Sequence, residues 1–210
     1  MRNFAEEMAY WYFRLNGFFL LDNFVLHNDG LDSTHSADID ILAIRQKYTF
    51  EIVGGREVDK HELLFRNFDD KKNIGIICEV KAGRTTPSDI RLTRRDRLRY
   101  GLERIGFFSH SKVNKLVVKL SSDPIVSGEY HQVGKVLITD DGRDIPSFIC
   151  ISLDEIHKFL KKHLRKYIDP KSRSKHFFPS PVIQQIIWEI EQDAKNKRTI
   201  RAEQRVYQNE

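Results

Sequence analysis

The sequence predicts an α/β fold in which a central mixed β-sheet is flanked by helices. Three short apolar runs indicate strands, at 18–26, 38–45 and 74–81. Apolar residues at three- and four-residue steps predict helices before and after these runs. Strands followed by a helix and then further strands favour one sheet with helices packed against it.

The first half of the chain alternates clear elements with polar segments. A helix is expected over 4–15, where Met8, Trp11 and Leu15 recur at helical spacing, and Asn16-Gly17 ends it. The first two strands are separated by a polar loop at 27–36. We interpret the polar stretch 46–72 as an insertion between the second and third strands.

The second half is predicted to return to the sheet and then become helical. Ser88 or Asp89 would cap the first helix, and Pro179-Ser180-Pro181 separates the last two. The predicted elements are a helix at 88–106, strands at 114–120, 134–138 (minor) and 147–152, a helix from 154 and a last helix from 181. We divide the chain into an α/β domain, 1–168, and a helical C-terminal extension, 169–210, that packs on the same domain.

Composition excludes several classes of protein. Of the 210 residues, 40% are hydrophobic and 11% aromatic, which is too many for a disordered chain. No apolar run approaches the ~20 residues that span a membrane, and the N-terminus is acidic where a secretory signal would be apolar. Cys78 and Cys150 form no Cys-x-x-Cys motif, which argues against a zinc knuckle. A cytoplasmic protein is expected.

Positive charge is unevenly distributed along the chain. The net charge of +5 hides a segment, 81–119, with 11 Lys or Arg against 3 acids, and another, 157–210, with 13 against 6. Basic blocks beside a net acidic remainder suggest a polyanionic partner such as nucleic acid. A solvated helix face is the alternative explanation.

Charged residues also occur inside two predicted strands. Asp38 and Asp40 alternate with isoleucines, and Glu79 and Lys81 end the third strand. Side chains two positions apart on a strand share a face, so each pair points the same way. If the two strands are neighbours, three carboxylates and one ammonium meet at one sheet edge.

Clustered carboxylates repel one another unless a cation holds them together. Mg²⁺ (or Mn²⁺) is a suitable cation, because it binds one or two carboxylates together with water and substrate phosphates. Bound metal activates water, and Lys81 could orient that water or offset charge in the transition state. The pattern therefore favours phosphodiester hydrolysis; a surface salt-bridge network on an edge strand is the structural alternative.

These residues resemble the core motif of the PD-(D/E)xK, or restriction-endonuclease-like, nucleases. The motif elements are Asp40 on an apolar strand and Glu79-Val80-Lys81 at the end of the next strand. The acid-x-Lys pattern occurs five times in the chain, but only here does it end an apolar strand. The resemblance covers about 4–120 and implies an αβββαβ core and a Mg²⁺-dependent endonuclease.

The resemblance also implies roles for individual residues. Asp40, Glu79 and the carbonyl of Val80 would hold the metal, and Lys81 would complete the catalytic group. Supporting residues would be Asp38 and an acid on the first helix, preferably Glu7, otherwise Glu6. Residues expected near nucleic acid are Arg91, Arg94, Arg95, Arg97 and His35.

DNA is the favoured substrate, and an RNA nuclease remains an alternative. A second alternative keeps the fold as a catalytically silent module for nucleic-acid binding or assembly. No phosphate-binding NTPase loop occurs, so any ATPase or targeting subunit would be another chain. The isoleucine stripe of the last helix is expected to pack on its own core, with a homodimer contact as the alternative.

Overall fold

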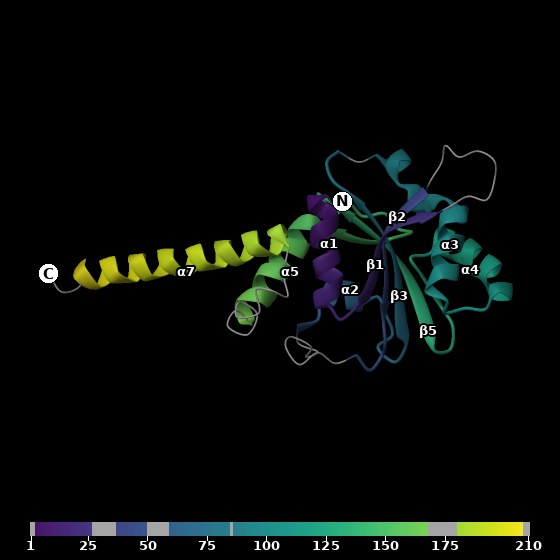
Figure 1. The fold of residues 1–210 in the computed structure, drawn as a ribbon, viewed down its shortest axis with the longest axis horizontal. Helices are drawn as coiled ribbons and strands as arrows, with labels where there is room; N and C mark the ends of the chain where they lie inside the picture. Colours follow the sequence, from purple (N-terminus) through teal and green to yellow (C-terminus); the bar gives the residue numbers. More distant parts are fainter. Residues whose placement is uncertain (1–2, 27–36, 50–58, 85, 168–179, 208–210) are drawn as a thin grey trace.

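A six-stranded mixed sheet lies at the centre of the computed structural model, with helices on both faces (Figure 1). The structure describes residues 3–26, 37–49, 59–84, 86–167 and 180–207. The predicted α/β class with a mixed sheet is thereby confirmed. His35 and the loop predicted at 27–36 lie outside the described residues, as does the predicted domain boundary at 168.

The strand order is β1-β2-β3-β5-β4, and β6 also pairs with β5. β1, β2 and β3 form antiparallel pairs, whereas β3 and β5 run parallel. The strands are β1 (Phe19–Leu26), β2 (Ala37–Arg45), β3 (Asn73–Lys81), β4 (Ile125–Ser127), β5 (His131–Thr139) and β6 (Ile149–Ser152). The three strands predicted from the first half of the sequence are therefore present and adjacent.

Helices α1 and α5 cover one face of the sheet, and α3 and α4 cover the other (Figure 1). The helices are α1 (Phe4–Leu15), α2 (Glu62–Phe65), α3 (Arg95–Ile105), α4 (His110–Ser122), α5 (Leu153–Lys166) and α7 (Pro181–Tyr207). Two 3₁₀ turns, η2 (Pro87–Asp89) and η3 (Arg91–Thr93), precede α3.

Each sheet face has its own hydrophobic cluster. Met8 and Ile156 pack with Cys78 on the α1/α5 face. Leu42 and Ile77, opposite each other on β2 and β3, pack with α3 and α4 on the other face. The alternation along each strand thus assigns consecutive residues to opposite cores.

The prediction of a strand at 114–120 is wrong, because this segment lies inside α4. Its β-branched residues suggested a strand, but Val113, Val117 and Leu120 lie three and four positions apart and are all buried. That spacing forms one helical stripe, and packing of the stripe outweighs the intrinsic preference of valine for strands.

Two further elements differ from the prediction. The helix expected at 88–106 is shortened to α3, because Pro87 starts a 3₁₀ turn and Ile90 and Arg94 adopt extended backbone angles. The minor strand expected at 134–138 is the nine-residue central strand β5. Lys135 conceals this strand in the sequence, yet it is fully buried and donates from Nζ to the carbonyl of Leu120 at 2.7 Å.

The start of α7 packs on the rest of the protein. Ile183, Ile186, Ile187 and Ile190 are buried in the cluster that contains α1 and α5, and beyond them the helix projects away from the sheet (Figure 1). The intramolecular packing expected for this stripe is present. Within the described ranges, no helix has both the length and the hydropathy needed to cross a membrane.

Candidate active site

The predicted acidic residues lie where β2 and β3 stop pairing. Their ladder ends with Ile41 opposite Cys78, so Asp40 and Glu79 are the next residues on the two strands. Beyond this point the Val80 N–H donates to a side chain: Oδ2 of Asp40 accepts its hydrogen bond at 2.7 Å. The strand parity predicted from the sequence thus brings the two acids to one corner of the sheet.

Glu79 is held by backbone donors from the segment that follows β3. The residue is 4% exposed, and its two carboxylate oxygens accept from the N–H groups of Arg91 (2.9 Å) and Leu92 (2.7 Å). Both donors lie in η3, the turn that replaces the start of the predicted helix. Charge-assisted bonds to backbone N–H groups fix the carboxylate in one position.

Lys81 completes the corner on the same side of β3 as Glu79. Its Nζ lies 2.9 Å from Oε1 of Glu79. The Lys81 side chain keeps a quarter of its surface exposed, whereas that of Glu79 keeps 5%. The ammonium group therefore neutralises part of a buried charge and still faces solvent, where a substrate could reach it.

The Asp40 carboxyl titrates in an environment that disfavours its charge. Burial raises the pKa of Asp40 to about 6, although the Val80 N–H and the Lys81 ammonium act in the opposite direction. The negative charges of Glu79 and Glu6 raise the Asp40 pKa further. The ionised form of Asp40 is therefore disfavoured here, and a bound metal ion would favour it.

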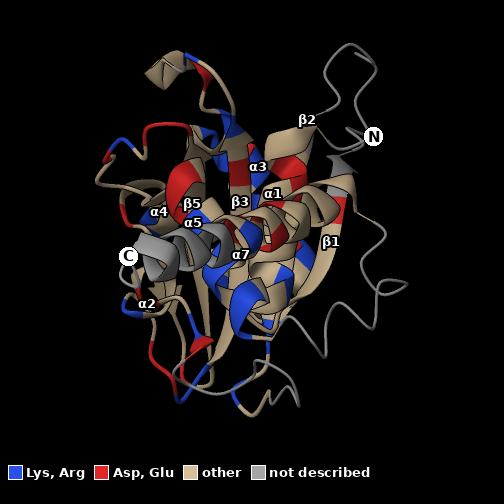
Figure 2. Cartoon of the chain, turned by 90° about the vertical axis from the view of Figure 1, so that its left-hand side faces the viewer, with Lys and Arg blue, Asp and Glu red and all other residues tan. Residues whose placement is uncertain are grey.

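The two acids of α1 have different contacts. Glu6 forms the capping box of the helix with Asn3, and its charge acts on Asp40. Glu7 accepts a hydrogen bond from the indole Nε1 of Trp11 at 2.8 Å. Figure 2 shows acidic positions of α1 and β3, and basic positions around α3, toward the same end of the sheet. Asp38 belongs to β2, but its side chain lies outside the part of the chain that the structure describes.

The predicted nucleic-acid arginines fall into two groups. Arg91, Arg94 and Arg95 are exposed, and Arg94 pairs with Asp96 at 2.8 Å. Arg97 is 5% exposed. Burial and the charge of Arg91 lower the pKa of Arg97, while Glu79 raises it. Arg97 thus acts electrostatically on the acidic corner from inside the protein, and the exposed arginines are those that can reach a polyanion.

The acidic corner offers a small donor set for a metal ion. Among the residues that the structure describes, no group of three or more His, Cys, Asp or Glu side chains is arranged to hold one. Asp40 and Glu79 supply two carboxylates, and Oδ1 of Asp40 makes no hydrogen bond to a described residue. Two carboxylates suit Mg²⁺, which keeps several waters and takes other ligands from the substrate.

Sequence reasoning missed the backbone donors of η3. Their only signal was Thr86-Pro87, which favours a turn and not the interior of a helix. Comparisons with protein-family models, curated proteins and solved structures find no match to this chain.

Proposed function

We propose that this protein is a metal-dependent nuclease that hydrolyses phosphodiester bonds, with DNA as the favoured substrate. One observation carries the proposal: Asp40, Glu79 and Lys81 lie together where β2 and β3 diverge, with the Asp40 pKa raised by burial and by neighbouring acids. A buried and a half-buried acid beside a partly exposed lysine are costly for stability, and such costs are typical of functional sites.

The residues present fit a divalent cation, with Mg²⁺ or Mn²⁺ as the cofactor. Asp40 and Glu79 would hold it, and the carbonyl of Val80 is a further candidate ligand. When bound, the ion would supply an activated water and offset charge on the attacked phosphate.

The other residues of the candidate site have separate tasks in this proposal. Lys81 would orient the nucleophile or stabilise the negative charge that develops on the phosphate. The η3 N–H groups of Arg91 and Leu92 keep Glu79 in place, so that the acid does not turn toward solvent. Exposed Arg91, Arg94 and Arg95 would contact the phosphate backbone, for which guanidinium groups are well suited.

A catalytically silent nucleic-acid-binding module is the second candidate, and one observation favours it. The Glu79 carboxylate already accepts two backbone N–H groups and pairs with Lys81. A carboxylate with three partners can be a structural anchor for η3 instead of a metal ligand. In that case the corner would bind no metal, and the exposed arginines would act alone.

The test is to incubate the purified full-length chain with plasmid, single-stranded DNA and RNA, each with Mg²⁺, Mn²⁺ or EDTA. The proposal predicts cleavage of DNA that requires the metal and is absent in Asp40→Asn. DNA that is retarded in a gel but uncut under every metal would favour the silent module. Cleavage of RNA alone would assign the site to an RNA nuclease.

A further inference from the structure

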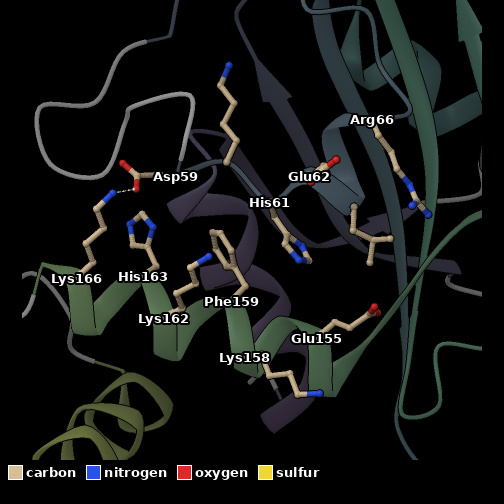
Figure 3. Close-up of a pocket in the computed structure, with 12 residues that line it drawn as sticks. Asp59, His61, Glu62, Arg66, Glu155, Lys158, Phe159, Lys162, His163 and Lys166 are labelled. Carbon is tan, nitrogen blue, oxygen red and sulfur yellow. Dashed lines mark hydrogen bonds and ion pairs between the residues drawn. The ribbon is translucent and has the colours of Figure 1, made fainter.

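A charged cavity lies on the opposite face of the sheet from the acidic corner. It has a volume of about 880 Å³ and opens between α5 and the segment that contains α2 (Figure 3). This size is within the range of small-molecule sites. Helix α5 packs in the hydrophobic cluster that contains Cys78, on one face of the sheet. Asp40 and Glu79 lie two positions from Leu42 and Ile77, which belong to the cluster on the other face, so the sheet separates the two sites.

The lining of this pocket has an excess of positive charge. Its charged residues are five basic and three acidic side chains: Lys60, Arg66, Lys158, Lys162 and Lys166, with Asp59, Glu62 and Glu155. Two of the acids are occupied. Asp59 accepts from Tyr167 Oη at 2.6 Å and pairs with Lys166, and Glu155 accepts from the N–H and hydroxyl of Ser152 at 3.0 Å each.

Two of the cations are available to a ligand. Lys158 pairs with Asp154 on its own helix. Lys162 and Arg66 are exposed, line the pocket from its two sides, and form no ion pair with any residue that the structure describes. They can therefore turn toward an anion without breaking an existing pair.

His61 offers a hydrogen-bond donor between these cations. The ring lines the pocket and packs against Phe159, with 5.1 Å between ring centroids. Its Nδ1 lies 2.7 Å from the hydroxyl of buried Tyr12. Burial raises the pKa of Tyr12, so the hydroxyl keeps its proton and can donate a hydrogen bond to Nδ1. In the tautomer that accepts from Tyr12 at Nδ1, the proton of neutral His61 is on Nε2.

The charge of Lys162 also reaches His61. Burial and the Lys162 ammonium lower the pKa of His61, whereas Glu155 raises it. The imidazole is thus neutral at pH 7 and acts as a donor without adding a third charge. An ammonium, a guanidinium and an imidazole N–H are the groups that recognise phosphate oxygens.

We propose that this pocket binds a small phosphate-bearing anion, held by Lys162, Arg66 and the Nε2–H of His61. The site is independent of the acidic corner, and the proposal does not rest on nuclease activity. The phosphate could belong to an inorganic ion or to an organic ester such as a nucleoside monophosphate. The chemistry that recognises the phosphate is the same in both cases.

The experiment is isothermal titration calorimetry of the full-length chain with inorganic pyrophosphate, phosphate and a nucleoside monophosphate. The buffer is treated with chelating resin and held at constant ionic strength, so that neither metal nor bulk screening changes. We expect saturable binding of at least one of the three, with Kd raised about tenfold in Lys162→Ala and in Arg66→Ala. Tighter binding of the nucleoside monophosphate than of phosphate would identify an organic ester as the ligand.

The matched control is Lys115→Ala, which removes an exposed lysine from α4 on the other sheet face. Its Kd should equal that of the unmodified chain, and so should that of Asp40→Asn. Absence of binding to all three probes would overturn the proposal, as would equal weakening by Lys115→Ala and Lys162→Ala. Because the titration contains no metal and no DNA, its outcome is separate from that of the cleavage test.

Discussion

The two charged sites on opposite faces of the sheet treat charge in different ways. At the acidic corner, one half-buried and one buried carboxylate are held by backbone N–H groups of Val80, Arg91 and Leu92, and Lys81 pairs with Glu79. In the basic pocket, two of the three acids are occupied, and exposed cations remain on long side chains. The first arrangement is rigid and costly, which suits the proposed catalysis, whereas the second is adaptable, which suits the proposed binding of a small anion.

The largest expected effect is on cleavage, and it separates the two sites most clearly. Lys81→Met should lower Mg²⁺-dependent DNA cleavage by about 100-fold or more, because the positive charge next to the reacting phosphate is removed. Lys158→Met, which removes an exposed lysine of the pocket, should leave cleavage unchanged. Initial rates on plasmid measure both, and equal decreases would show that no special role belongs to Lys81.

The next effect is on stability. Glu79→Ala leaves the N–H groups of Arg91 and Leu92 without their acceptor, and should lower the free energy of unfolding by about 3 kcal/mol. Glu155→Ala, at the half-buried acid of the α5 capping box, should cost about 1 kcal/mol. Urea denaturation measures both changes. A smaller decrease for Glu79→Ala than for Glu155→Ala would contradict the anchoring of η3 by Glu79.

A third prediction uses the pH dependence of Asp40. The protonated form of this carboxyl stabilises the native state at low pH, and that contribution is lost as pH rises through about 6. Without metal, Asp40→Asn should therefore stabilise the protein by on the order of 1 to 3 kcal/mol at pH 8. The difference should shrink as the pH is lowered from 6 toward 4.

Denaturation curves at pH 8 and pH 4.5 measure this difference, and Mg²⁺ supplies the control. Added Mg²⁺ should raise the Tm of the unmodified chain at pH 8 but not that of Asp40→Asn, because ligand binding stabilises only the protein that holds the ion. If the free energies of unfolding of the two proteins differed by the same amount at both pH values, burial would not raise the pKa of Asp40.

The smallest effect concerns DNA binding around the acidic corner. Alanine at Arg91, Arg94 or Arg95 should weaken binding modestly and reduce the salt dependence of log K by about one for each phosphate that the variant no longer neutralises. Lys162→Ala should leave the slope of log K against salt unchanged, because Lys162 lines the basic pocket on the other face of the sheet. Fluorescence anisotropy over a salt series measures the slopes, and a reduced slope in Lys162→Ala alone would place DNA over the basic pocket.

Strand parity made part of this site predictable. A period of two places Glu79 and Lys81 on one face of their strand, and Asp40 joins them once β2 and β3 pair in the observed register. The pairing of Glu79 with Lys81 follows from the same rule. Residues whose neighbours are set by local periodicity could therefore be assigned from the sequence.

The remainder depends on tertiary packing. Val117 favours strands by itself and becomes helical because its stripe on α4 is buried. Lys135 can be part of a central strand because a carbonyl of α4 accepts a hydrogen bond from its Nζ. The donors to Glu79 are backbone groups, so no residue type reveals them. The basic pocket joins His61 to Lys162 across about a hundred residues, which no local pattern encodes.

The most direct test of the acidic corner is a crystal of the full-length chain soaked with Mn²⁺ and examined by anomalous scattering. We expect one strong peak within about 2.2 Å of carboxylate oxygens from both Asp40 and Glu79. A protein that cleaves DNA while its Mn²⁺ lies elsewhere, or a corner that stays without metal at saturating Mn²⁺, would contradict the proposed centre.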